Sequence, residues 1–318
     1  MENQIQTPHK RRVRYKGKYP KKFEEKYKEL QPEKYKDTIE HVIQKGNTPA
    51  GMHISIMVKE IIDFLNIQPG EIGFDATLGY GGHTKAMLKC LNGKGHIYAT
   101  DVDPEESDKT KKRLADQGFG EDLLTVKLQN FCTIDEIAKE VGGFDFILAD
   151  LGVSSMQIDN PKRGFSFKVD GPLDLRLNQE AGISAAERLD TITRDELAGM
   201  LYENSDEPYC EELAKAITDE IRKGNRIDTT TKLRQVIEKT LDFLPEKEKK
   251  ETIKKTCQRT FQALRIDVNH EFEVLYEFME KLPDALRPGG RVAILTFHSG
   301  EDKLVKKALK AGYKDGIY

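Results

Sequence analysis

The feature that most constrains the fold is a regular alternation of short apolar runs with helical patterns between residues 53 and 150. Apolar residues recur at helical spacing between the runs, as expected for helices that cover a sheet. The expected strands are 72–78, 95–100, 123–128 and 144–149, and the expected helices are 53–67, 84–91 and 104–116. Near-continuous apolar strands separated by helices predict an α/β fold with a parallel sheet covered on both faces.

The alternation stops at about residue 160 and resumes near residue 259. Residues 160–258 are polar, with helical patterns and no convincing strand. A further helix is expected over 260–282, and Pro288-Gly289-Gly290 should turn into a last buried strand over 291–297. We therefore expect a helical insertion in the sheet domain. An insertion at the carboxyl end of a strand lies beside the ligand crevice of such a sheet, where it can hold a substrate.

These patterns divide the chain into three regions. Residues 1–52 form a basic extension, 53–159 and 259–318 form the sheet domain, and 160–258 form the inserted helical domain. In the extension, His9 to Lys22 contains no acidic residue and includes Tyr15 and Tyr19. Such a segment can neutralise phosphates and stack on bases, or it can be a solvated tail. This stretch does not decide between the two.

Composition excludes several classes of protein. The chain has 318 residues and no apolar run of membrane-spanning length, and no apolar region follows its basic start. Secretion and membrane insertion are therefore not expected. The four cysteines are far apart and form no CxxC pair, which fits a reducing, cytoplasmic location and predicts no metal site. They are Cys90, Cys132, Cys210 and Cys257.

A glycine loop follows the first expected strand and suggests a nucleotide-like ligand. In Gly79-Tyr80-Gly81-Gly82-His83, glycines allow close approach of a ligand, and the amides of the next helix face it. Asp101, at the end of the second strand, is placed to bind both hydroxyls of a ribose. The third glycine of the dinucleotide fingerprint is missing, and Asp75 would repel a pyrophosphate but suit a cationic methionine group. We therefore favour S-adenosylmethionine over a dinucleotide.

The fourth strand ends in a polar motif, Asp150-Leu151-Gly152-Val153-Ser154-Ser155-Met156-Gln157. The amino group of a cytosine is a poor nucleophile because its lone pair is delocalised into the ring. An oxygen that accepts its hydrogens can free that lone pair, and transfer then depends on positioning and charge. Asp150 is the candidate acceptor, and Ser154 or Ser155 could add a hydrogen bond. Alternatively, Asp150 only caps the next turn.

Five motifs in this order resemble one family. It is the bacterial 16S ribosomal RNA cytosine-N4 methyltransferases, known as MraW or RsmH, and the resemblance runs from about residue 53 to about residue 306. The motifs are DLGVSSMQID, RGFSF, DGPLDLRLN, RTFQALRIDVN and PGGRVAILTFHSGED. The resemblance implies a Rossmann-like class I methyltransferase sheet with an inserted helical substrate-recognition domain. It also implies S-adenosylmethionine as cofactor, and cytosine N4 in the decoding region of the small ribosomal subunit as target.

The resemblance also implies roles for individual residues. Asp101 falls on the ribose-binding acid and Phe131 on an aromatic residue beside the adenine. Asp150 and Gln157 match the polar residues of the strand-four motif. The glycine loop is matched by Gly81, Gly82 and His83, with Asp75 and Gly79 as further candidates for the cofactor site from the reasoning above.

Two departures from the family pattern carry expectations. Gly300 stands where relatives usually have leucine, so the final helix should start loosely and the geometry around His298 is in question. His298 is a site candidate or a structural histidine. Relatives also continue beyond Tyr318 into a basic tail that supplies the last strands of the sheet. The strand over 291–297 is therefore expected to be an exposed edge.

Several residues keep two interpretations. Four arginines in the motifs could contact phosphate. For Arg259 and Arg265 the alternative is that they pair with acids and hold a helix to the insertion, which is the better prediction. Phe165 and Phe167 could stack on a flipped base or, more commonly, belong to the core. The arginines are Arg163, Arg176, Arg259 and Arg265. Three rival functions are a DNA amino-methyltransferase, a nicotinamide-dependent dehydrogenase and a non-catalytic RNA-binding or ribosome-assembly factor. The two prolines of the common DNA methyltransferase motif are missing here. The sequence does not indicate the oligomeric state.

Overall fold

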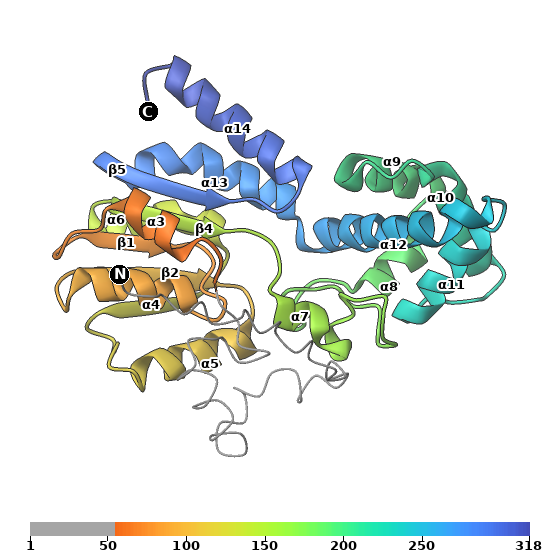
Figure 1. Cartoon of the computed structure of the whole chain (residues 1–318), viewed down its shortest axis with the longest axis horizontal. Helices are drawn as coiled ribbons and strands as arrows, with labels where there is room; N and C mark the ends of the chain where they lie inside the picture. Colours follow the sequence, from red (N-terminus) through yellow and green to blue (C-terminus); the bar gives the residue numbers. More distant parts are fainter. Residues whose placement is uncertain (1–54) are drawn as a thin grey trace, which may run out of the picture. The chain divides into compact units, whose positions relative to one another are not determined.

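The computed structural model describes residues 55–318 (Figure 1). The basic segment from His9 to Lys22 and the first residues of the helix expected over 53–67 lie outside the described residues. No helix in residues 55–318 combines the length and the apolarity needed to span a bilayer.

The centre of the sheet domain is a five-stranded parallel sheet with the order β3-β2-β1-β4-β5 (Figure 1). The expected strands and the α/β class are confirmed, with small shifts at the ends. The strands are β1 (Ile72–Asp75), β2 (His96–Asp101), β3 (Leu124–Leu128), β4 (Phe144–Asp150) and β5 (Leu286–Leu295). The chain order reverses between β1 and β4, where parallel α/β sheets open a ligand crevice at their carboxyl ends.

Helices cover both faces of this sheet. One face packs against α3 (Val58–Leu65), α4 (Gly82–Leu91) and α5 (Pro104–Ala115). The other packs against α6 (Ile134–Val141), α13 (Glu271–Ala285) and α14 (Ser299–Lys314). The central strand β4 serves both cores, because its side chains alternate between the faces and nearly all are buried.

The short helices α7 (Ser155–Asp159) and η3 (Pro161–Arg163) lead from β4 into the insertion, whose regular elements are all helices. In Figure 1 these helices lie together beside the sheet. They share a hydrophobic core of their own, distinct from the two cores of the sheet. They are α8 (Ala185–Thr191), α9 (Arg194–Ser205), α10 (Cys210–Arg222), α11 (Thr230–Thr240) and α12 (Glu246–Asn269).

The helix expected over 260–282 is in fact two helices. Residue 260 lies inside α12, which begins at Glu246 and ends at Asn269, and α13 then starts at Glu271. Between them His270 takes a left-handed conformation, with φ of 51°. Apolar spacing alone did not reveal this break. The break at His270 allows α12 to pack in the core of the insertion and α13 to pack on the sheet, although the two helices are consecutive in the chain.

The Pro288-Gly289-Gly290 turn lies inside β5 instead of preceding it. The pairing of β4 with β5 jumps from Phe144↔Leu286 to Phe146↔Arg291, so the extra residues form an irregularity in a longer strand. Gly289 supplies the left-handed conformation there, with φ of 80°. β5 is an edge of the described sheet, as predicted.

Candidate functional site

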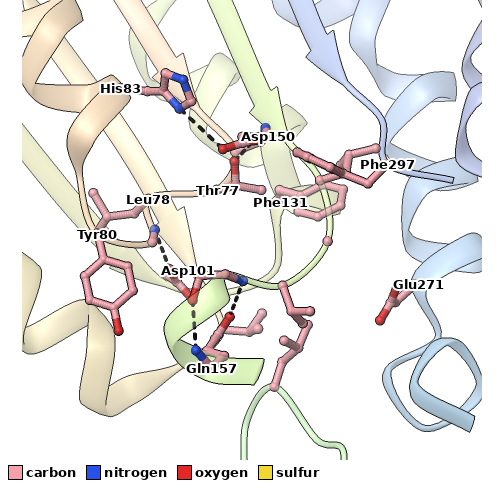
Figure 2. A pocket seen from close by; sticks show the side chains of 18 of the residues that line it. Thr77, Leu78, Tyr80, His83, Asp101, Phe131, Asp150, Gln157, Glu271 and Phe297 are labelled. Carbon is pink, nitrogen blue, oxygen red and sulfur yellow. Dashed lines mark hydrogen bonds and ion pairs between the residues drawn. The ribbon is translucent and has the colours of Figure 1, made fainter. Parts of the chain in front are cut away.

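A cavity of about 260 Å³ lies at the carboxyl ends of β1, β2 and β4 (Figure 2). Its walls come from the glycine loop, the β2 and β4 ends, and residues Phe131 and Ser55. Leu177 of the insertion, with Asn269 and Glu271 where α12 passes into α13, closes the other side, and Figure 2 shows Glu271 facing the pocket. The cavity therefore lies where the chain reversal of the sheet predicts a ligand.

The glycine loop takes a shape that side chains would prevent. Gly81 has φ of 71° and caps α4, and a Cβ there would lie 2.8 Å from Cγ2 of Thr110. A Cβ on Gly82 would lie 2.1 Å from Oγ of Ser55. Both glycines line the cavity, and the first amides of α4 start beside it. Such a helix start attracts a negatively charged ligand group.

Asp101 ties the glycine loop to the end of β2. Its Oδ2 accepts a hydrogen bond from the amide of Gly79 at 2.8 Å, and its Oδ1 accepts one from the amide of Asp103 at 2.9 Å. Burial raises the pKa of Asp101 to about 6, although both amides oppose the shift. The carboxylate lines the cavity and is held in one orientation, as a group that binds a ribose must be.

Asp75 does not line the cavity, which corrects the expected contact with a cationic ligand group. Its Oδ1 accepts from the amide of Thr77 at 3.0 Å, and its Oδ2 accepts from the hydroxyl of Thr84 at 2.6 Å. The side chain is 1% exposed, and burial raises its pKa. Asp75 therefore holds Thr77, which precedes the glycine loop, and Thr84, which follows it. The motif gave its position but not the direction of its side chain.

His83 faces Asp150 at one end of the cavity (Figure 2). Its Nδ1 lies 3.4 Å from Oδ2 of Asp150, and its Nε2 lies 2.8 Å from the carbonyl oxygen of Ile56. Burial lowers the pKa of His83, but the hydrogen bonds to Asp150 and Ile56 and the charge of Asp75 outweigh it and raise the pKa. His83 lines the cavity, as expected for a residue of the cofactor site, and its ring nitrogens connect the β4 end to the chain before α3.

This geometry determines where protons lie. A carbonyl oxygen can only accept, so Nε2 of His83 carries a proton. Nδ1 then faces a carboxylate oxygen, and that contact is attractive only when a proton lies between them. The other oxygen of Asp150, Oδ1, is buried and has no hydrogen-bond partner in residues 55–318. A buried acceptor without a partner is costly unless a ligand satisfies it.

The loop after β4 is held by a capping box at the start of α7. Oγ of Ser154 accepts from the amide of Gln157 at 3.1 Å, and Oε1 of Gln157 accepts from the amide of Ser154 at 2.9 Å. The side-chain nitrogen of Gln157, Nε2, donates to Oδ2 of Asp103 at 3.3 Å. Ser154, Ser155 and Gln157 all line the cavity, but only Ser155 has a side chain without a bond inside the described chain.

Phe131 lies in the cavity wall at the start of η2 (Phe131–Thr133). Its ring meets Phe278 of α13 edge to face, with centroids 5.2 Å apart. Phe297 also lines the cavity, and Figure 2 labels both rings there. Two aromatic side chains therefore contribute to the apolar part of the cavity wall.

His298 caps the final helix and does not line the cavity. Its Nδ1 accepts from the amide of Glu301 at 3.4 Å, and its Nε2 lies 3.1 Å from Oε1 of Glu301. The expected loosening near Gly300 is not found, because the ring of Phe272 fills the space. A Cβ on Gly300 would lie 2.5 Å from that ring. Helix α14 begins at Ser299 with its cap intact.

Three side chains near this cap converge in a way that the motifs did not reveal. Glu271, His298 and Glu301 bring nitrogen and oxygen atoms within 4.8 Å of one another, as metal ligands do. Arg265, however, donates to both oxygens of Glu271, each at 2.8 Å. The amide of Phe297 donates to Glu301 at 2.8 Å. The carboxylate of Glu271 is therefore already paired with an arginine.

Pairing with acids, the preferred prediction for Arg259 and Arg265, is confirmed for Arg265, and the structure pairs Arg163 and Arg176 as well. Arg163 donates to Asp103 at 2.6 Å, and both are buried. Arg176 donates to Asp174 through two nitrogens, at 2.9 and 2.8 Å. Arg265 pairs with Glu271, as above. Arg259 makes no ion pair with residues 55–318.

Phe165 and Phe167 differ in how far they are buried, which bears on the choice between a core role and stacking on a base. Phe165 is 8% exposed and packs in the insertion core beneath the guanidinium of Arg163, 5.7 Å from its ring centre. Phe167 is only half-buried, at the edge of that core.

Several cavity residues were missed from the sequence. Oδ1 of Asn269 accepts from the amide of Leu177 at 2.7 Å, and its amide nitrogen donates to the carbonyl of Leu175 at 2.8 Å. Asn269 thereby holds the insertion chain against the end of α12. Asn269 belongs to the motif RTFQALRIDVN, but the motif does not indicate that it binds the backbone of residues 175 and 177. The other missed residues include Ser55, Ile56, Tyr80, Asn130, Glu271 and Phe297.

Comparison with known proteins supports the resemblance of the motifs. The family model of the MraW methylase family matches residues 50–316. A protein of Agathobacter rectalis named ribosomal RNA small subunit methyltransferase H 1 is 87% identical over 98% of this chain and 89% of its own length. One of the same name from Lachnoclostridium phytofermentans is 70% identical over 100% of this chain and 86% of its own. A ribosomal RNA small subunit methyltransferase H of Phocaeicola vulgatus is 40% identical over 83% of this chain and 82% of its own.

Proposed function

The chain belongs to the MraW methylase family, and from this premise we propose that it methylates N4 of a cytosine in the 16S RNA of the small ribosomal subunit. The methyl donor is S-adenosylmethionine. The observation that carries the proposal is Oδ1 of Asp150, a buried acceptor without a partner in residues 55–318, at the end of β4 beside the cavity.

The cavity residues fit this cofactor along its length. Asp101 would accept from the ribose hydroxyls, and Phe131 would pack on the adenine. The amides at the start of α4, after Gly81 and Gly82, would receive the carboxylate of the methionine part. Gly79 and Gln157 would act indirectly, by holding Asp101 and the β4 loop. Asp75 would hold the loop from beneath, and His83 would hold Asp150.

The bound cofactor supplies an activated methyl group on a sulfonium, for in-line attack by a nitrogen. Asp150 would accept a hydrogen bond from the cytosine amine through Oδ1, which localises the nitrogen lone pair and orients it. His83 would hold the other carboxylate oxygen and so fix the orientation of Asp150. Ser155, whose hydroxyl is free of bonds in the described chain, could also donate to the substrate. His298 would not contact the substrate; it would position Glu301, which does line the cavity.

We also propose a division of labour between the regions. Residues 160–258 would bind RNA, since this helical insertion has its own core and flanks the cavity. The basic segment before residue 52 would add phosphate contacts. The sheet domain would bind the cofactor and perform the transfer.

The direct test uses small ribosomal subunits isolated from cells that lack this modification. Wild-type protein and the isosteric variant Asp150→Asn are incubated with labelled S-adenosylmethionine, and the nucleosides are separated by mass spectrometry. We expect N4-methylcytosine with wild type and a loss of at least about 100-fold in the variant. Cofactor binding should change by less than about threefold, since Asp150 is assigned to the substrate.

A matched control is Asp159→Asn, a carboxylate further along the same segment and outside the cavity. It should keep near wild-type transfer. Label in a different nucleotide would refute the assigned reaction, and equal transfer by Asp150→Asn would refute the role of Asp150.

A further inference from the structure

A second recess opens on the other side of the loop that follows β4. It has a volume of about 340 Å³, within the range of small-ligand pockets. Val153 belongs to the walls of both the recess and the cofactor cavity. The remaining walls come from residues 158–168 and from one face of α12. A group in this recess would therefore be separated from Asp150 only by the Leu151–Val153 loop.

The walls of the recess combine aromatic and cationic side chains. Phe167 and Phe261 meet edge to face with centroids 5.8 Å apart, and Phe167 is only half-buried, so it can offer its ring to a ligand. Lys168 and Lys254 are exposed at the same recess, and no acidic residue of the described chain lines it. Aromatic rings with nearby lysines are the usual means of holding a single-stranded nucleotide, the ring stacking on the base and the lysine meeting the phosphate.

The positive charge of the recess is available to a ligand. Lys168 forms no ion pair with residues 55–318, and Lys254 has only a long contact of 3.8 Å to Glu251. The third cation in the wall, Arg265, is already held by Glu271. Gln258 adds an amide without a partner in the described chain, which can donate to and accept from the edge of a base.

We propose that this recess binds a nucleotide that flanks the target cytosine, with its base on Phe167 and its phosphate at Lys168 and Lys254. The inference rests on the proposed function, because the target base itself must lie at Asp150. Binding a neighbour across Val153 would pull the target out of its stack and hold it at the cofactor cavity. Residues outside the reacting centre would then set both the affinity and the sequence preference for the RNA.

The experiment compares two adjacent lysines of α12. Lys254→Ala removes a cation of the recess, whereas Lys255→Ala removes a lysine that does not line it. Both lysines make an equally long contact with Glu251, at 3.8 and 3.9 Å, and both are more than half exposed. Phe167→Leu keeps apolar packing but removes the stacking ring, and Phe243→Leu is its control, since Phe243 is 67% exposed elsewhere on the insertion.

Two quantities are measured for each variant with unmodified small subunits: the equilibrium Kd without cofactor, and KM and kcat for methyl transfer. We expect Phe167→Leu to raise both Kd and KM about tenfold and Lys254→Ala to raise them about threefold to tenfold. The value of kcat and the Kd for S-adenosylmethionine should change less than twofold. Both control variants should behave as wild type.

Equal effects of Lys254→Ala and Lys255→Ala, or an unchanged Kd in Phe167→Leu, would overturn the proposal. A fall in kcat at constant KM would also overturn it, because the recess would then act on the target base. The binding comparison is independent of catalysis. If wild-type protein forms no N4-methylcytosine, the proposed function fails, while the Kd values still decide whether the recess binds RNA.

Discussion

Nδ1 of His83 lies 3.4 Å from Oδ2 of Asp150, so the first residues of α4 and the last residue of β4 are joined across the cavity floor. The second ring nitrogen of His83 is bound to the carbonyl of Ile56. One histidine therefore links the β4 motif and the chain before α3. The predictions below start from this contact and extend to the neighbouring ones.

Replacing His83 should affect transfer more than cofactor binding. In His83→Gln the carboxylate of Asp150 loses the ring nitrogen that orients it, and we expect kcat to fall about tenfold to 100-fold. The Kd for S-adenosylmethionine, measured by calorimetry, should change less than threefold. His96→Gln is the control, because His96 lies at the start of β2 outside the cavity and its ring nitrogens bond to Asp122 and Thr125. A parallel loss in cofactor affinity would mean that His83 touches the cofactor instead.

The same contact should make stability depend on pH. The pKa of His83 is raised in the folded protein, so its stabilising effect is full at pH below its unfolded value and is lost as pH rises through the folded value. We expect His83→Gln to cost about 1.5–3 kcal/mol at pH 6 and clearly less at pH 9. Denaturant unfolding of both proteins at the two pH values measures this. A cost that grew with pH would contradict the assignment.

Cofactor binding should weaken in mild acid through Asp101. With a pKa of about 6, roughly a tenth of the carboxyl groups are ionised at pH 5, and only the ionised form accepts from both ribose hydroxyls. The Kd for S-adenosylmethionine should therefore rise about tenfold between pH 7 and pH 5. In Asp101→Asn binding should be weaker at pH 7 and nearly independent of pH. Asp108→Asn, at an exposed site on α5, should retain the wild-type profile.

The buried pair of Arg163 and Asp103 should be important for stability. Arg163→Met leaves Asp103, which is 2% exposed, without its cation, and such a loss costs about 3–5 kcal/mol. Exposed Arg222 pairs with Asp219 at 3.8 Å, so Arg222→Met should cost less than about 1 kcal/mol. Chemical denaturation would measure both. A cost of less than about 1 kcal/mol for Arg163→Met would show that the pair contributes little to folding.

Two helical glycines should respond oppositely to alanine. A Cβ added to Gly199 in α9 would have no heavy atom within 4 Å, so Gly199→Ala should stabilise the protein by about 0.5–1 kcal/mol. Gly300 faces the ring of Phe272, so Gly300→Ala should give no gain and should destabilise unless that ring moves. Thermal unfolding of the two variants and of Gly300→Ala combined with Phe272→Ala tests this. Recovery of the gain in the double variant is the expected result.

The sheet and the position of the site could be predicted from the sequence, because both depend on local patterns. Buried strands need apolar runs, and a loop that approaches a ligand needs glycine, as at Gly81. Asp101 and Asp150 could be placed for the same reason, since each ends an apolar run that reads as a strand. The helix break at His270 has no such local sign: no glycine or proline marks it, and the packing of α12 and α13 on different cores decides it.

Side-chain directions and partners were decided by the tertiary structure alone. The same motif contains Asp75, which turns away from the cavity to Thr77 and Thr84, and His83, which turns to Asp150. Residues far apart in the chain, such as Arg163 and Asp103 or Gly300 and Phe272, become neighbours only when helices dock. Sequence alone determined which residue types stand at the carboxyl edge of the sheet, because strand and turn preferences are local. Their partners depended on the folded arrangement, since pairing of charges and filling of space act between segments that the chain brings together only on folding.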